Sequence, residues 1–590
     1  MMQRRNVRDL TPIETEEDVI LFEMHKLAVT KGRNAVSSRA AKIVDFSSQY
    51  GNNNALSYTA QNLVGPPTVY PLSGDNAYSF HPRTYGKWWE ISPSHLKSEV
   101  ILPSTIIAES QDFIEFNVVK RVAPQLLRVY EVYNPGAIVK VLCYCYETEK
   151  WVIIWQGAPQ VLPPEESRCF TVAFEGIEFM TDLYRLEFHH RHLDYFCEID
   201  GLILYGENRR CSKFFTSENM STKKYASNNE MEIDEKSEKN GLSMLPSEVT
   251  SFIFSFLDFR SLCSASRTSR LFKKICYDPA LYRDLNLQPY WHLVDEDFLM
   301  SLGSRLSLLK KLNLSWCGGQ KRITPSFFAL FLKYNCQNLT SLRLANCSFV
   351  DNDCLCAVAN LCPNLKELDI RCCRSEDLQM LGFKRISKMS NLVYLNLYRT
   401  LIDDIPLKEI IKSLKLKHLS IAACSNIQNI NDIVNSIGIH LRSSLITLDI
   451  WRSVDLKCPA VREISECSNL LELDMSWCPK IDAGCGCLKS IIEGCPKLRK
   501  LFLSAIRTLS NSELYSIAMH CPDIEQLDIL GSREYTLHGV KSLLQTCKKM
   551  KLLDVSYSSI EIRQNVAYLQ TLFPAVSIKC SFPRTANAAH

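Results

Sequence analysis

Cysteine is the residue type in this sequence that could most readily do chemistry. The chain has 590 residues and 25 cysteines, 18 of which follow residue 300. Cysteine thiolates bind zinc, usually through two matched pairs with C-x₂₋₄-C spacing. The pairs Cys354/Cys356 and Cys485/Cys487 have the shorter C-x-C spacing, and neither is followed by a matched second pair. We therefore favour buried structural thiols over zinc binding, and we expect neither a metal nor a cofactor.

Other chemistry has little support in the sequence. No GxxxxGK[ST], HExxH or GxSxG motif and no protein-kinase set is present, so we expect no enzyme. A net charge of +4 over this length is too small to predict nucleic-acid binding. We find no apolar segment of the secretory type and no apolar stretch near 18 residues, so reduced thiols are expected.

The cysteines follow a repeat. The string LKKLNLSWC, residues 309–317, recurs in nine later variants, and the second leucines of the ten copies are Leu312, Leu342, Leu368, Leu395, Leu419, Leu448, Leu473, Leu501, Leu527 and Leu553. Each unit offers a short parallel strand and a helix, and neither can bury its apolar face without the neighbouring unit. Residues 289–583 are therefore predicted to form an α/β leucine-rich-repeat horseshoe of about ten units, with residues 584–590 as a tail.

The residues that follow each second leucine should line the concave face of this horseshoe. Asp449 lies beside Asp474 there, and Asp528 lies beside Asp554. Adjacent carboxylates repel each other, so each pair needs backbone amides or basic partners. We favour bonds to loop amides.

Large aromatic side chains on the same face point to a different role. Tyr398 and Trp451 should face solvent, where they have no packing function, and interfaces are enriched in Tyr, Trp and Arg. We predict that they bind a protein substrate together with Arg371, Arg399 and Arg452.

A predicted helical segment, residues 242–288, precedes the repeats. Leu245 and Pro246 open a pattern in which Val249, Ile253 and Phe256 recur at helical spacing. So short a helical segment cannot bury this much apolar surface alone, so it must pack on the repeats or on another chain.

This segment resembles the F-box, the helical hairpin by which substrate receptors bind the Skp1 adaptor of a cullin–RING ubiquitin ligase. Phe272 departs from the pattern, because many F-boxes have Trp there. An F-box followed by cysteine-rich leucine repeats is identified as a member of the leucine-rich F-box family. The resemblance implies Skp1, cullin-1 and a RING protein as partners, no catalytic residue in this chain, and adaptor contacts by Leu245, Pro246, Glu248, Ile253, Phe256, Leu257, Leu262 and Cys263.

Residues 44–206 contain β-rich runs such as DFIEFNVV, LLRVYEVY and IVKVLCYCY, separated by turn residues, and this spacing predicts a β-sandwich. The order of the runs resembles a discoidin-like jelly roll. Ligands of such domains bind at loops of one end, where Trp88, Trp89 and Arg83 are candidates, although buried tryptophans are the favoured interpretation.

The remaining segments are polar. Residues 207–241 are predicted to be a disordered linker. Residues 1–43 are predicted to be a targeting or disordered lead: acidic residues from Glu14 to Asp18 are unlike a transit peptide, whereas the stretch after Met24 is basic and rich in Ser and Ala.

The multidomain order, over residues 40–583, resembles mitochondrial members of the family. This implies a receptor on the cytosolic face of the outer mitochondrial membrane, with cytoplasm or nucleus as alternatives. It also implies BH3-like mitophagy receptors as substrates and a PP2C-type phosphatase as co-receptor. The substrate-receptor interpretation competes with one alternative, a carbohydrate- or lipid-binding scaffold that uses the β-sandwich.

Overall fold

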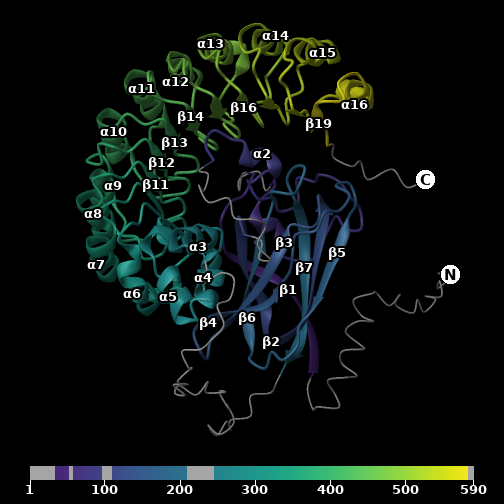
Figure 1. Ribbon diagram of the computed structural model, residues 1–590. Helices are drawn as coiled ribbons and strands as arrows, with labels where there is room; N and C mark the ends of the chain where they lie inside the picture. The colour runs from purple at the N-terminus through teal and green to yellow at the C-terminus, as the bar shows by residue number, and fades with distance from the viewer. Residues whose placement is uncertain (1–33, 52–56, 96–108, 209–244, 582–590) are drawn as a thin grey trace, which may run out of the picture.

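A parallel sheet backed by helices curves around an antiparallel β domain (Figure 1). The computed structural model describes residues 34–51, 57–95, 109–208 and 245–581. The β domain comes from the first 208 residues and lies inside the arc that the last 300 residues form. The arrangement brings together segments that are several hundred residues apart in the chain.

The curved sheet has twelve parallel strands in chain order. They are β8 (Asp284–Asn286), β9 (Lys311–Asn313), β10 (Ser341–Arg343), β11 (Glu367–Asp369), β12 (Tyr394–Asn396), β13 (His418–Ser420), β14 (Thr447–Asp449), β15 (Glu472–Asp474), β16 (Lys500–Phe502), β17 (Gln526–Asp528), β18 (Leu552–Asp554) and β19 (Ser577–Lys579). The second leucines pair with one another, from Leu312 with Leu342 to Leu527 with Leu553. The ten predicted strands are therefore present in the predicted register, and β8 and β19 extend the sheet at its two ends.

Helices pack behind the strands. They are α6 (Glu296–Leu302), α7 (Pro325–Asn335), α8 (Asn352–Leu361), α9 (Met380–Ile386), α10 (Asp404–Ser413), α11 (Ile430–His440), α12 (Cys458–Glu463), α13 (Cys487–Gly494), α14 (Asn511–His520), α15 (Leu537–Thr546) and α16 (Ile560–Leu572). Polar caps begin many of them; Ser510, for example, forms a capping box with Glu513 at the start of α14. One apolar core runs continuously from Leu285 to Ile578.

Most repeat cysteines are structural thiols. The Sγ atoms of Cys347 and Cys373 lie 3.0 Å from the carbonyl oxygens of Leu314 and Leu344, in the preceding units. A small buried thiol therefore fills the strand end and donates a hydrogen bond to its neighbour. Burial raises the pKa of the Cys362 thiol to about 12, so this thiol is protonated at neutral pH.

The β domain consists of β1 (Asn34–Phe46), β2 (Asp112–Tyr133), β3 (Ile138–Cys145), β4 (Lys150–Gln156), β5 (Arg168–Ala173), β6 (Thr181–Phe188) and β7 (Glu198–Asn208). Long strands β1 and β2 each pair in two antiparallel sheets, one with β7 and β5 and the other with β6, β3 and β4. Apolar residues of both sheets form one core. The two runs predicted in residues 112–133 form one continuous strand with a register shift between Asn117 and Val122.

The predicted lead of residues 1–43 is too long, because β1 begins at Asn34 and pairs with β7. Ser38 and Ala40 of this strand are buried, and the Ser/Ala composition of the segment concealed the strand. Residues 1–33 lie outside the described residues. So does the predicted linker, except that residues 207 and 208 end β7.

Short helices complete the fold. The segment before the repeats forms α3 (Ser247–Phe254), α4 (Phe259–Ala265) and α5 (Arg270–Cys276), and the β domain carries α2 (Lys87–Glu90). The 3₁₀ turns are η1 (Ala60–Leu63), η3 (Pro279–Tyr282), η4 (Gln288–Tyr290), η5 (Gly303–Leu306), η6 (Gly319–Lys321), η7 (Ile464–Glu466) and η8 (Ala483–Cys485).

Candidate functional site

The helical segment begins where local polar signals place it. Pro246, which was expected at the first helical position, is the N-cap residue of α3, and the helix begins one residue later at Ser247. The Asp258 side chain accepts a hydrogen bond from the Ser261 amide and begins α4, while Ser269 accepts one from the Phe272 amide and begins α5. These caps fold residues 246–276 into three short helices.

The inner side of this segment has a small core and is attached to the repeats. Phe254, Leu262, Ile275 and Cys276 are buried together, with Phe272 partly buried against them. Phe272 lies 5.1 Å from Phe254, centroid to centroid, so phenylalanine serves at the position where tryptophan is more usual.

One aromatic residue attaches α4 to the horseshoe. The Phe259 ring contacts the rings of Tyr290 and Phe298, with centroids 5.9 and 5.8 Å apart. The segment is therefore packed on the first repeat unit and cannot move far relative to it.

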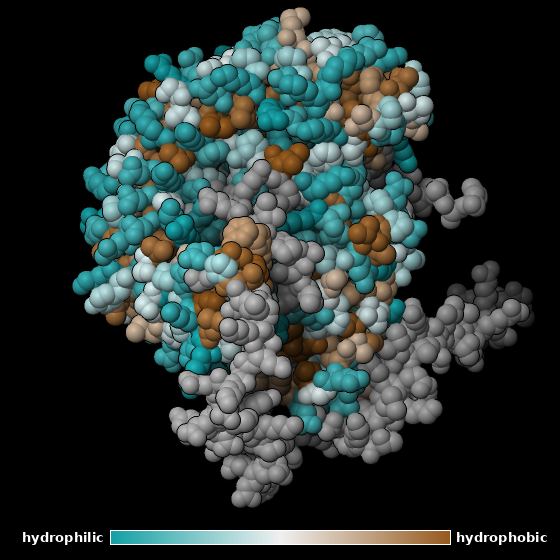
Figure 2. Space-filling view, in the orientation of Figure 1, coloured by the Kyte–Doolittle hydropathy of each residue, from teal (hydrophilic) through white to brown (hydrophobic). Residues whose placement is uncertain are grey.

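The outer side of α3 is apolar, and the described part of the chain leaves it exposed. Val249, Phe252, Ile253 and Phe256 follow helical spacing, and 42%, 65%, 39% and 49% of their surfaces are exposed. Leu245, just before the helix, is 39% exposed. Hydrophobic side chains gather over α3 and α4 in the space-filling view (Figure 2). Contiguous apolar surface of this kind marks an interaction site.

Most of the predicted adaptor contacts lie on this outer side. Leu245, Pro246, Glu248, Ile253 and Phe256 are exposed. Leu257 and Cys263 are half-buried, and Leu257 packs partly into the inner core.

Leu262 was placed wrongly, and Phe252 was missed. Leu262 is only 4% exposed because α4 turns it toward Phe254 and Ile275, so it supports the helices instead of facing a partner. Phe252 is the most exposed apolar residue of the segment and packs edge-on against Phe256. Its spacing of three from Val249 and four from Phe256 was the signal for it.

The concave face of the horseshoe is covered at Tyr398 and Trp451. Tyr398 is 5% exposed and Trp451 1%, so the prediction that both face solvent is wrong. The β domain covers them: the Arg83 guanidinium carbon lies 5.0 Å from the Trp451 ring centroid and 5.6 Å from that of Tyr398. The repeat pattern identified the face correctly but carried no information about what fills it.

The three arginines predicted to contact substrate differ in exposure. Arg371 and Arg452 are more accessible than Tyr398 and Trp451, whereas Arg399 is bonded to the β domain. The Arg371 side chain is 41% exposed and lies 3.3 Å from Asp369, and Arg452 is half-buried. Arg399, by contrast, donates a hydrogen bond of 2.6 Å to the Phe46 carbonyl and lies over the Phe46 ring. Arg399 therefore holds the β domain in place.

The adjacent carboxylates have both kinds of partner that were considered. Arg83 donates to both oxygens of Asp449, at 2.8 and 2.7 Å, and also bonds Asp474. Each aspartate also accepts a backbone N–H two residues on, from Trp451 and Ser476. One half-buried cation therefore neutralises the repulsion between neighbouring strands.

The second carboxylate pair, Asp528 and Asp554, is bonded by two tyrosine hydroxyls instead of an arginine. The Tyr50 hydroxyl donates to Asp528 at 2.9 Å, and the Tyr195 hydroxyl donates to Asp554 at 2.7 Å. Burial and then the charge of Asp554 raise the pKa of Asp528 to about 8, and burial raises the pKa of Asp554 to about 6. At neutral pH this pair holds a proton, which removes most of the repulsion.

Polar bonds join the β domain to both ends of the horseshoe. At the first unit, Gln288 donates to the Ser110 carbonyl at 2.8 Å and Trp291 donates to Glu187 at 2.7 Å. At the last strand, Lys579 pairs with Asp194.

The loop end of the β domain faces the horseshoe. Lys500 donates to the Trp88 carbonyl at 2.7 Å, and Trp88 and Trp89 pack partly against an aromatic cluster that includes Phe502. The favoured interpretation of these tryptophans as packing residues holds, although they pack between domains.

A search of the described ranges for a helix long and apolar enough to cross a membrane found none. The F-box-like family model matches residues 242–288. A protein of Bos taurus, F-box/LRR-repeat protein 4, is 33% identical over 614 aligned positions, covering 99% of this chain and 97% of that protein. This chain belongs to the F-box/LRR-repeat protein 4 family. The resemblance to the leucine-rich F-box family is thereby confirmed.

Two more distant similarities were found. Lysine-specific demethylase 2B of Mus musculus is 26% identical over 262 residues, which are 42% of this chain and 19% of that protein. Among solved structures, a chain of the yeast Rad7 and Elc1 complex matches with a TM-score of 0.42 and 14% identity, covering 56% of this chain and 92% of the other.

Proposed function

We propose that this F-box protein is the substrate-recognition subunit of an SCF-type ubiquitin ligase, bound to a Skp1 adaptor through the outer side of α3. The observation that carries the proposal is the apolar stripe from Val249 to Phe256, which the described chain leaves exposed. Burying one large apolar side chain stabilises an interface by roughly 1.5–3 kcal/mol, and four such residues on one helix face form the kind of cluster that dominates binding energy.

The proposed role needs positioning and no catalysis. In such ligases the substrate lysine attacks the ubiquitin thioester that a partner enzyme carries, and the receptor holds the substrate at a defined place. Phe259 and its ring contacts fix the F-box on the first repeat unit, and Gln288 and Trp291 fix the β domain on the same unit. Adaptor, β domain and repeats would therefore keep one relative orientation.

The test is co-purification of the whole chain with Skp1 and cullin-1. Phe252→Asp and Phe256→Asp should each reduce recovery of the adaptor at least about 10-fold, because a carboxylate would be buried in the interface. Met519→Asp on α14 is the matched control, since Met519 is 75% exposed and lies on a repeat helix. Equal adaptor recovery with the unmodified chain and with all three variants would refute the proposal.

Three finer assignments are also proposed, on the strength of the family resemblance. They are a discoidin-like type for the β domain, residence on the cytosolic face of the outer mitochondrial membrane, and BH3-like mitophagy receptors as substrates with a PP2C-type phosphatase as co-receptor. Fractionation of cells with and without Lys26→Ser, Lys31→Ser and Arg33→Ser tests the location. Proximity labelling under proteasome inhibition tests the partners. Enrichment of mitochondrial surface proteins supports the proposed location and substrates, and an exclusively cytoplasmic or nuclear set of labelled proteins refutes both.

The alternative, a carbohydrate- or lipid-binding scaffold, loses its expected site. The side chains proposed for a ligand were Arg83, Trp88 and Trp89, and all three now lie against the horseshoe. No second function is therefore proposed.

A further inference from the structure

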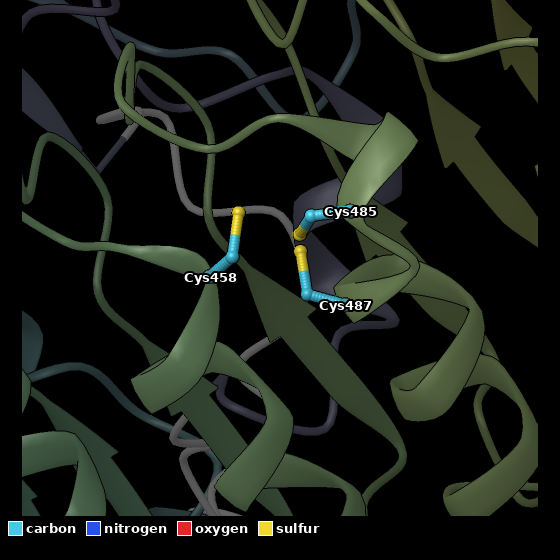
Figure 3. Close-up of side chains that lie close together, drawn as sticks. All are labelled: Cys458, Cys485 and Cys487. Carbon is cyan, nitrogen blue, oxygen red and sulfur yellow. The ribbon is translucent and has the colours of Figure 1, made fainter.

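Three cysteines of two successive repeat units converge at one point (Figure 3). Cys458 is the first residue of α12, Cys485 ends η8, and Cys487 is the first residue of α13. Their Sγ atoms all lie within 4.8 Å of one another. Zinc–sulfur bonds of about 2.3 Å in tetrahedral geometry place two sulfurs about 3.8 Å apart, so one ion can reach all three atoms after small rotamer changes.

The backbone between the two nearer cysteines explains why both point the same way. Gly486, between Cys485 and Cys487, has φ +78°, a left-handed conformation that side chains rarely adopt. The chain reverses there, so the two thiols meet. The other C-x-C pair provides a contrast: Cys354 and Cys356 both lie within α8, where residues two apart point about 200° apart around the helix.

The repeat does not account for these three thiols. The repeat cysteines occupy a strand end or a helix end, and several of them donate to a carbonyl of the preceding unit, as Cys478 does to Ile450. Cys458, Cys485 and Cys487 lie outside both positions, and Cys458 and Cys485 are half-exposed. A soluble metal ion can therefore reach them.

The surroundings of the three thiols are mixed. The Asp482 carbonyl accepts hydrogen bonds from Cys458 and Cys487, at 3.4 and 3.7 Å, and burial raises the pKa of both thiols. The Arg462 side chain donates to the Cys485 carbonyl, which places a guanidinium beside the cluster. The Asp482 amide donates to Cys458 Sγ at 3.4 Å. Cations and amide donors near sulfur stabilise its anionic form, which is the form that binds metals.

We propose that Cys458, Cys485 and Cys487 form a three-thiolate site for a thiophilic d¹⁰ metal ion, zinc or copper(I), with a further coordination position open to solvent or to a partner. Binding would release three protons, one from each thiol, and would form three metal–sulfur bonds. The ion would join the start of α12 to the start of α13 and so fasten two adjacent units.

Cobalt(II) is the direct probe, because its thiolate complexes absorb visible and near-ultraviolet light. The whole chain, purified under reductant and freed of metal by a chelator, is titrated with cobalt(II). One ion per chain should give thiolate charge-transfer bands. Cys485→Ser and Cys458→Ser should each weaken cobalt binding by more than about 100-fold, beyond the loss expected from removing a group that only orients a ligand. Cys356→Ser is the matched control, and it should bind cobalt as the parent does.

Competition then identifies the ion. Displacement of cobalt by zinc, or by copper(I) buffered with a chromogenic chelator, supports the site and shows which ion it prefers. Thermal unfolding provides a second readout, since an ion that binds the folded chain raises the midpoint in the parent and in Cys356→Ser but not in Cys485→Ser. Absence of charge-transfer bands, unchanged bands in Cys485→Ser, or a disulfide among the three residues under reductant would each overturn the proposal.

Discussion

The concave face of the horseshoe and the outer side of α3 both present large apolar side chains, yet the chain treats them in opposite ways. On the concave face, Trp451 is 1% exposed under the β domain, whereas Phe252 on α3 is 65% exposed. Arg83 and the two tyrosines Tyr50 and Tyr195 complete the covered face with charge and hydrogen bonds. An aromatic residue on a repeat face therefore marks an interface. Whether that interface is with another domain of the same chain or with another protein depends on the rest of the chain.

The largest expected effect is on the covered face. Arg83→Ala removes the cation between Asp449 and Asp474 and leaves two half-buried carboxylates facing each other. We expect the free energy of unfolding to fall by about 3–5 kcal/mol, measured by urea denaturation at neutral pH. Adding Asp449→Asn and Asp474→Asn should restore part of the loss. A triple variant no more stable than Arg83→Ala would show that the carboxylates are not the cause.

Truncation of a covered aromatic should be nearly as costly. Trp451→Ala leaves a cavity beneath Arg83, and we expect a loss of about 3 kcal/mol in the free energy of unfolding. Its neighbour Arg452 is half-buried, so Arg452→Ala should cost less than about 1 kcal/mol. Similar small losses for both variants would mean that Trp451 is free to face a substrate after all.

The proton held by the covered carboxylates makes stability depend on pH. The pKa of Asp528 is raised to about 8 by burial and by Asp554, far above its unfolded value near 4. A raised pKa stabilises the fold below the unfolded pKa, and this contribution is lost as pH rises through about 8. The free energy of unfolding should therefore fall between pH 6.5 and 8, by up to about 1.4 kcal/mol per pH unit.

Three other titrating groups act outside this pH window. Burial lowers the pKa of His292 and of His418 to about 4, so their contribution changes below pH 6.5. Burial lowers the pKa of Lys500 to about 8, so its contribution changes mainly above pH 8. Asp528→Asn should remove most of the decline between pH 6.5 and 8. An unchanged decline in that variant would assign the proton to another group.

The smallest expected effect is on the uncovered face. Phe252→Asp should change the free energy of unfolding by less than about 0.5 kcal/mol, because the side chain is already solvated. Phe254→Ala, two residues along the same helix, should cost about 3 kcal/mol because Phe254 is 4% exposed. Urea unfolding measures both variants. If Phe252→Asp and Phe254→Ala lose the same free energy of unfolding, the assignment of an exposed and a buried side of α3 is wrong.

The repeat strands could be predicted because their signal is local and periodic. Leu312 and the nine leucines that follow it recur at nearly constant intervals, and stacked units bury them in register. The F-box helices were equally readable, since Asp258 and Ser269 are ordinary caps and Val249, Ile253 and Phe256 share one face.

Contacts between distant segments left no such pattern. Arg83 and Asp449 are 366 residues apart, and nothing near either residue indicates the other. The third cysteine of the cluster, Cys458, lies in the repeat unit before Cys485, so a search for matched pairs along the chain could not find it. Leu262 was misplaced because spacing alone does not tell which side of a short helix will face inward.

The bonds from the β domain to Gln288 and to Lys579 have a mechanical consequence. In an open solenoid, small rotations between successive repeat units add up, so the radius of curvature can adapt to a bound protein. Here the β domain fills the concave side of the horseshoe and is bonded near both of its ends, which prevents those rotations from accumulating. The span from the F-box to α16 is thus set by the size of the β domain and stays constant whether or not a target is held.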